Sequence, residues 1–101
     1  MVALCRRRRR ALLTKPLKFT AAELIINYST AAAGSVRVEI QGPGGAPIKG
    51  FSLADCPAIV GDEIEHAVRW TDDPNLGALA GKPVRLRFVM KEADLFSFRF
   101  R

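Results

Sequence analysis

The stretch "GSVRVEIQG" (residues 34–42) decides the fold class of this chain. Along it, Val36, Val38 and Ile40 alternate with charged or polar residues. Successive side chains of a β-strand point to opposite faces of a sheet, so this alternation predicts a strand with one face buried and one face in water. Glycines bracket the stretch at both ends, where turns are expected.

The same alternation recurs in four further stretches, and the shorter "PLKF" (residues 16–19) predicts a sixth strand. The four are "AAELIINYS" (residues 21–29), "GDEIEHAVRW" (61–70), "KPVRLRFVMK" (82–91) and "DLFSFRFR" (94–101). Loops rich in glycine and proline separate the strands, chiefly at residues 41–50 and 71–83. The four residues "KEAD" (91–94) predict a tight antiparallel hairpin.

Alternation also predicts which side chains are buried. In the stretches 61–70 and 94–101 the inward face carries Ile64, His66, Val68, Trp70, Phe96, Phe98 and Phe100. Leu95 falls on the outward face of the last stretch. The predicted core comprises Leu24, Ile26, Val36, Val38, Ile40, Val68, Leu86, Phe88, Phe98 and Phe100.

Several short strands at close spacing, joined by turns, are typical of a β-sandwich or barrel. No segment has a 3.6-residue period long enough for a helix, apart from one helical turn at residues 75–81. The sequence therefore predicts a single all-β domain, an antiparallel β-sandwich of jelly-roll or concanavalin-A-like type, with little or no helix. A length of 101 residues suits one such domain.

The basic charge of the chain is concentrated near its start. Sixteen Lys and Arg against ten Asp and Glu give a net charge of +6. Five arginines occupy residues 6–10, and without them 11 basic residues face 10 acidic ones, which leaves +1. A nucleic-acid-binding domain would carry basic and aromatic residues together on its folded surface. The sequence thus predicts no nucleic-acid partner, a basic leader at residues 1–13 and a sandwich domain at residues 14–101.

The leader does not match an export signal. A signal peptide needs an apolar run of roughly 7–15 residues after its basic start, whereas only residues 11–13 separate the arginines from Thr14. No run approaches the roughly 18 apolar residues of a membrane span, so no membrane partner is predicted. We expect residues 6–10 to be extended or disordered and dispensable for folding, either as a leader or as the remnant of a first strand. The location of the chain stays open.

Cys5 and Cys56 are the only cysteines. Two cysteines this far apart fit no zinc pattern, because zinc needs three or four ligands, usually in close pairs. Two free thiols are favoured over a disulfide between them. Cys56 is expected to be a half-buried apolar residue in a loop.

No set of residues matches a catalytic signature. His66 is the only histidine and lies on a predicted core face, so we expect a core or core-edge residue with one hydrogen bond. Glu63 and Glu65 share a strand face about 6.5–7 Å apart. Glycoside hydrolysis uses such a spacing only across a cleft that holds a sugar, so we expect these residues, with Asp62, on a solvated face. A small enzyme is a third hypothesis, and a concave pocket that joins His66 to a carboxylate would be evidence for it.

The candidate ligand-binding residues lie near loops. Trp70 and Tyr28 carry rings that could stack on sugar faces, although their registers also suit the core. Asp72, Asp73 and Asn75 share one loop and carry the oxygen ligands that Ca²⁺ prefers. The same three residues also suit an ordinary Asp-Pro-Asn turn, and three side chains fall short of the six to eight ligands of Ca²⁺. Calcium is the one cofactor to consider, and the sequence requires none.

Two long segments together resemble a known kind of domain. They are "PIKGFSLADCPAIVGDEIEHAVRW" (residues 47–70) and "LAGKPVRLRFVMKEADLFSFRF" (residues 79–100). They are similar to the C-terminal β-sandwich domain of large secreted bacterial glycosidase-like proteins, which resemble the sialidase-like and invertase-like propeller families. The resemblance covers residues 14–100. It implies a non-catalytic accessory domain that binds a glycan weakly or packs against a catalytic propeller, within a parent protein that is secreted or periplasmic.

The chain departs from this pattern in its first residues, where the arginine run replaces a longer strand and loop. This departure leads to the expectation of a detached piece of a larger protein. A second hypothesis follows, in which the domain is structural and assembles with copies of itself. An edge strand left without its partner would then pair with another copy.

Overall fold

The structure of the protein is a computed structural model that describes residues 2–7 and 11–101. Its strands are β1 (Val2–Arg7), β2 (Ala11–Leu13), β3 (Leu24–Gln41), β4 (Asp62–Ala67) and β5 (Arg85–Phe100). Two short 3-10 helices, η1 (Leu53–Asp55) and η2 (Leu76–Leu79), are the helical segments of the described residues. Within that part of the chain, no helix has the length and apolar character needed to cross a membrane. The predicted all-β class is confirmed, and η2 lies where one helical turn is predicted.

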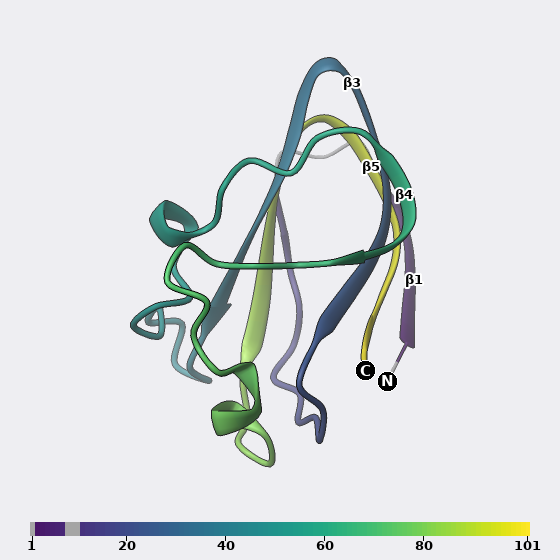
Figure 1. Ribbon diagram of the computed structural model, residues 1–101. Helices are drawn as coiled ribbons and strands as arrows, with labels where there is room; N and C mark the ends of the chain where they lie inside the picture. Colours follow the sequence, from purple (N-terminus) through teal and green to yellow (C-terminus); the bar gives the residue numbers. More distant parts are fainter. Residues whose placement is uncertain (1, 8–10) are drawn as a thin grey trace.

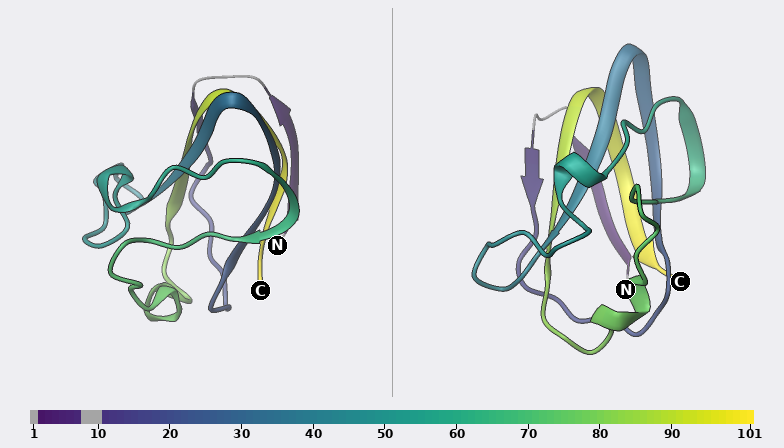
Figure 2. Two further views of the ribbon diagram at one scale, coloured as in Figure 1. Left: turned by 45° about the horizontal axis from the view of Figure 1, so that its top comes forward. Right: turned by 60° about the vertical axis from the view of Figure 1, so that its left-hand side comes forward.

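All strand pairs are antiparallel, and the sheet has the order β1-β5-β3-β4, with β2 also paired to β5. The two central strands pair from Leu24 and Phe100 at one end to Gln41 and Arg85 at the other. Both strands arch, so that each rises to a bend and descends again (Figures 1 and 2). The sheet is therefore folded over, and the two halves of each long strand lie on opposite sides of the interior.

The bend of β3 lies against the bend of β5. The pairing of the two strands shifts between Thr30 and Ser35, and Glu92 of β5 has a φ of 46°. Gly34 permits this close approach, because a Cβ there would lie 2.6 Å from the carbonyl oxygen of Lys91 and closer still to that of Glu92. A residue with no Cβ is required where two backbones come this close.

The hairpin predicted at residues 91–94 is instead a bend within one continuous strand, β5. The predicted strands at residues 21–29 and 34–42 likewise join in the single strand β3. The reason is that each half of one long strand pairs with a half of the other long strand, not with its own continuation. Local turn chemistry thus marks the position of each bend without identifying the strand partners.

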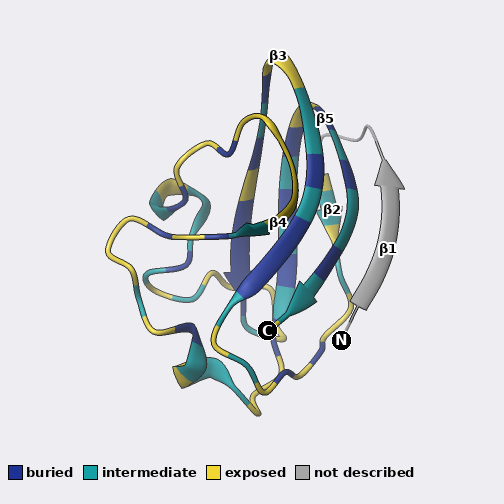
Figure 3. Ribbon diagram, turned by 45° about the vertical axis from the view of Figure 1, so that its right-hand side comes forward, coloured by how far each residue is buried: buried dark blue, intermediate teal, exposed yellow. Residues whose placement is uncertain are grey.

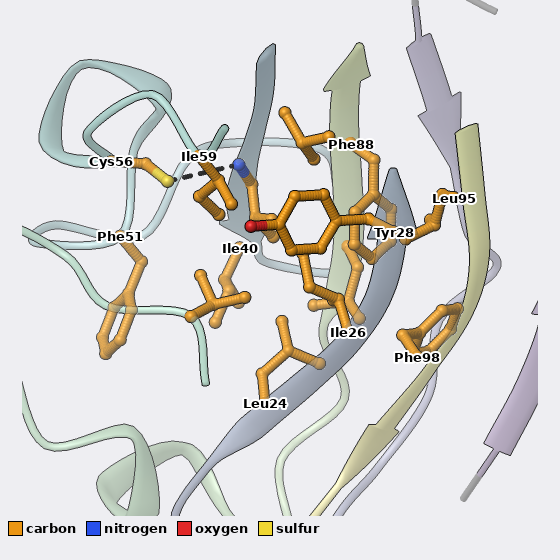
Figure 4. Close-up of a cluster of buried hydrophobic side chains, with 14 of the residues drawn as sticks. Leu24, Ile26, Tyr28, Ile40, Phe51, Cys56, Ile59, Phe88, Leu95 and Phe98 are labelled. Carbon is orange, nitrogen blue, oxygen red and sulfur yellow. Dashed lines mark hydrogen bonds between the residues drawn. The ribbon is translucent and has the colours of Figure 1, made fainter. Parts of the chain in front are cut away.

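The core fills the space between the two halves of the folded sheet (Figures 3 and 4). The ring centroids of Phe88 and Phe98, which come from different halves of β5, lie 5.3 Å apart. Burial is confirmed for the predicted core residues Leu24, Ile26, Val36, Val38, Ile40, Val68, Leu86, Phe88 and Phe98. Phe100 is the exception, because its side chain is partly exposed and packs against the margin of the core.

A β-bulge in β4 changes the face of one predicted core residue. Ile26 and Tyr28, two residues apart in β3, pair with His66 and Glu63, which are three residues apart in β4. The extra residue shifts the alternation by one position. The predicted inward position of Ile64 is therefore wrong, and its side chain is 75% exposed.

A second bulge, in β5, exchanges two more positions. Asn27 and Tyr28 are consecutive in β3, but they pair with Ser97 and Leu95. Phe96 is the extra residue and is only partly buried, whereas Leu95 is fully buried. The predicted outward position of Leu95 is wrong for this reason, since Leu95 and not Phe96 lies in the core.

The described part of the basic leader belongs to the sheet. β1 and β2 both pair with β5, with β1 at the edge farthest from β4. Residues 8–10, within the arginine run, lie outside the described residues, and the expectation that the run is extended or disordered falls partly on them. Residues 2–7 and 11–13 thus extend the same sheet as the domain predicted at residues 14–101.

Candidate functional site

The two candidate aromatic rings lie inside the molecule. Trp70 is 4% exposed and donates its indole N–H to the carbonyl oxygen of Val38 at 3.0 Å. Tyr28 is fully buried among the core side chains, as Figure 4 shows. Neither ring presents a face to the solvent, so neither forms the sugar-stacking platform that the sequence suggests.

The hydroxyl of Tyr28 ties β3 to β4 and to the loop before it. It lies 2.8 Å from the carbonyl oxygen of Val60 and 3.3 Å from Oε2 of Glu63. Burial, together with the negative charges of Glu63 and Asp62, raises the pKa of Tyr28 to about 12. The hydroxyl therefore stays protonated and acts as a donor at neutral pH.

His66 and Glu63 form a hydrogen-bonded pair beside this hydroxyl. Nδ1 of His66 lies 2.7 Å from Oε2 of Glu63, and the imidazole meets the ring of Tyr28 edge-on, with centroids 5.5 Å apart. Glu65 is engaged separately, at 3.0 Å from Arg99 and 3.7 Å from Arg101. The two glutamates thus have different partners, and only one of them is joined to the histidine.

The candidate calcium residues form a turn. The side-chain oxygen of Asn75 accepts the backbone N–H of Gly77 at 3.0 Å and caps η2. Asp73 has a φ of 47° and lies 3.4 Å from Arg69, while Asp72 is exposed. Over the described residues, no three His, Cys, Asp or Glu side chains are grouped so as to hold a metal ion.

One concave site lies where the chain enters β3 and leaves β5. This Phe100 depression has a volume of about 320 Å³ and is lined by Lys18, Phe19, Thr20, Ala21, Gly81 and Phe100. The rings of Phe19 and Phe100 stack in parallel, with centroids 4.2 Å apart and an interplanar angle of 6°. A backbone hydrogen bond of 2.8 Å from Gly81 to Phe19 fixes one wall.

A second concave site lies between β4 and the loop that precedes it. This His66 groove also has a volume of about 320 Å³ and is lined by Pro57, Ala58, Ile59, Val60, His66, Ala67 and Arg69. Most of its lining residues are apolar, and His66 and Arg69 are the polar ones. It is thus a concave pocket that a hydrogen bond joins to a carboxylate, through His66 and Glu63.

Sequence reasoning misses both sites for identifiable reasons. Phe100 continues the apolar alternation of β5, and nothing local indicates that it lies at the margin of the core. Glu63 and His66 are three residues apart, so plain alternation places them on opposite faces of the strand. The bulge in β4 is what brings their side chains together.

No protein-family model, no curated protein and no solved structure matches the chain. The similarity to glycosidase accessory domains therefore remains a prediction.

Proposed function

We propose that this protein is a non-catalytic carbohydrate-binding domain that holds a sugar residue in the Phe100 depression. The observation that carries this proposal is the parallel pair of Phe19 and Phe100 in the lining of a concave site. Phe100 is partly exposed, whereas Phe19 is buried behind it. A flat ring supported from behind is suited to stack on the apolar face of a pyranose.

Polar groups complete the depression. Lys18 and Thr20 are both exposed and line the same hollow. Their ammonium and hydroxyl groups can bond to sugar hydroxyls on the rim while the ring holds the apolar face. A volume of about 320 Å³ lies at the lower end of the range for ligand pockets. This size favours a single sugar residue and weak binding.

The wider proposal follows the resemblance. The folded-over sheet would be a sandwich of jelly-roll or concanavalin-A-like type, serving as the accessory domain of a carbohydrate-active protein. Its partners would be a glycan or a catalytic propeller, and its parent would be secreted or periplasmic. A calcium ion held by Asp72 and Asp73 would have a structural role in this turn, where Asn75 caps η2.

A glycan array followed by calorimetry tests the proposed function. The wild-type chain should bind at least one sugar at millimolar concentration. Replacing Phe100 with leucine keeps an apolar side chain but removes the flat ring, and should weaken binding about tenfold, or about 1.4 kcal/mol. The matched control is Phe96→Leu, the same change on the same strand outside the depression. If no sugar binds the wild-type chain, only a packing role remains.

One further observation favours the alternative of self-assembly. β4 lies at an edge of the sheet and carries the exposed side chain of Ile64, and Val60, in the loop that precedes β4, is also exposed. Unpaired strand edges with apolar side chains tend to pair with other chains. Light scattering tests this alternative, because a strict monomer at high concentration would exclude it. If the chain self-associates, Ile64→Lys should restore the monomer.

A further inference from the structure

We propose that the His66 groove is a second binding site, specific for a small hydroxycarboxylate. Such a ligand carries a hydroxyl group beside a carboxylate, on a compact carbon frame. In the groove, His66 would accept a hydrogen bond from the hydroxyl group and Arg69 would hold the carboxylate. The site is independent of the proposed sugar site, since the two share no lining residue.

The hydrogen bond that His66 donates to Glu63 determines what its other ring nitrogen offers to a ligand. A carboxylate oxygen only accepts, so the ring proton of His66 lies on Nδ1, which donates to Oε2 at 2.7 Å. In the neutral ring, Nε2 then carries a lone pair and can accept a hydrogen bond from a hydroxyl group. This directionality favours a ligand with an O–H group at that position.

Buried contacts hold this pair in place. The hydroxyl of Tyr28 lies 3.3 Å from the same Oε2 of Glu63, and the ring of Tyr28 packs edge-on against His66. Because Tyr28 is fully buried in the core, the pair is tied to the rigid part of the sheet. Sites with supported side chains bind better, since less ordering is needed on binding.

Arg69 supplies the positive charge of the groove. Its guanidinium has two carboxylate partners at 3.8 Å and 3.4 Å, Glu23 and Asp73, and its side chain is 65% exposed. A carboxylate in a bidentate pair lies about 2.7–2.9 Å from the arginine nitrogens. Glu23 and Asp73 both lie farther from Arg69 than this. A ligand carboxylate can therefore replace these loose contacts at little energetic cost.

The rest of the lining limits the size and chemistry of the ligand. Pro57, Ala58, Ile59 and Ala67 provide an apolar surface against which a short carbon frame can pack. Among the residues that the structure describes, the lining contains no serine, threonine or cysteine, so it offers no hydroxyl or thiol nucleophile. Binding, and not covalent catalysis, is the chemistry that these side chains support.

Nitrogen NMR of the full chain tests the proposal, because His66 is the only histidine. Sodium lactate and sodium glucuronate are the probes, representing a free hydroxy acid and a sugar acid. Propionate lacks the hydroxyl and methyl lactate lacks the charge, so both serve as matched controls. The Nε2 resonance should move saturably with at least one probe, and each control should bind about tenfold more weakly. Saturation by glucuronate alone would assign the site to acidic sugars, and saturation by lactate would assign it to small free acids.

Variants locate the binding. Arg69→Gln should weaken the effective probe about tenfold, while Arg85→Gln, an arginine outside the groove, should leave it unchanged. Circular dichroism of each variant establishes that the sheet is intact. The proposal is overturned if no probe moves the Nε2 resonance up to about 50 mM, or if folded Arg69→Gln binds as well as the wild-type chain.

Discussion

The indole N–H of Trp70 donates to the carbonyl oxygen of Val38 at 3.0 Å and takes the place of a strand partner. Val36 and Ile40, on either side of Val38, bond to backbone groups of the segment 46–60. Between Val36 and Ile40, the segment 46–60 turns away from β3. The side chain of Trp70 therefore satisfies a buried carbonyl group that the backbone of the edge does not reach.

Replacing Trp70 with phenylalanine should destabilise the fold by about 1–3 kcal/mol, because it leaves the carbonyl of Val38 without this donor. Urea unfolding followed by circular dichroism measures the change. The chain has one tryptophan, so its indole proton gives a single NMR signal that should exchange slowly with solvent. Exchange within minutes, under conditions where the sheet is folded, would contradict a buried bond.

Cys56 is the hydrogen-bond partner of the backbone N–H of Val38. This N–H donates to Sγ at 3.4 Å (the dashed line in Figure 4). The structure places Cys56 as a free thiol, 2% exposed, and burial raises its pKa. A thiol that is both buried and protonated reacts slowly. In a Cys5→Ser chain, an alkylating reagent should therefore label Cys56 only as fast as the protein unfolds. Labelling at the rate of a free thiol in native protein would refute this burial.

Gly34 should be far less tolerant of substitution than Gly44. A Cβ there would meet the carbonyl oxygens of Lys91 and Glu92, whereas a Cβ on Gly44 would have no atom within 4 Å. Because the neighbours of Gly34 are backbone atoms, they cannot move aside. Gly34→Ala should cost about 1–3 kcal/mol of stability or more, while Gly44→Ala should change it by less than about 0.5 kcal/mol. Equal unfolding midpoints for the two variants would show that the bends do not touch.

The strand pattern could be predicted from the sequence because burial on one face leaves a period of two. Val36, Val38 and Ile40 lie in the core as that period predicts. The class of the fold follows from such stretches and from the glycine-rich loops between them. How the strands pair does not follow, because pairing depends on contacts between segments far apart in the chain. For the same reason, the sequence does not predict that β3 continues through its bend as one strand.

The candidate sites were less predictable than the core. A bulge is set by the fit between two strands, and one extra residue reverses the face of every side chain beyond it. This effect exposes Ile64 and brings Glu63 to His66. Trp70 could be assigned to the interior from its register, but its hydrogen bond to Val38 could not. The partial exposure of Phe100 depends on where the core ends.

Tyr28 should make stability depend on pH in the alkaline range. Its pKa is raised from 10.0 to about 12 in the folded protein, first by burial and then by Glu63 and Asp62. Between pH 10 and pH 12 the unfolded chain has lost the phenolic proton while the folded chain retains it. The unfolding free energy should therefore be unaffected by this group below pH 10 and should fall by about 1.4 kcal/mol per pH unit between pH 10 and pH 12.

The single tyrosine of the chain makes this prediction easy to measure. Absorbance of the phenolate near 295 nm follows Tyr28 alone, and urea unfolding at each pH gives the stability. Tyr28→Phe is the control, because it keeps the ring but has no hydroxyl to ionise. Its unfolding free energy should lack the decrease between pH 10 and pH 12 that Tyr28 causes. Glu63→Gln should lower the pKa of Tyr28 while keeping it above 10, since burial is the larger cause. A folded protein whose tyrosine titrates at pH 10 would show that the hydroxyl is neither buried nor held beside Glu63.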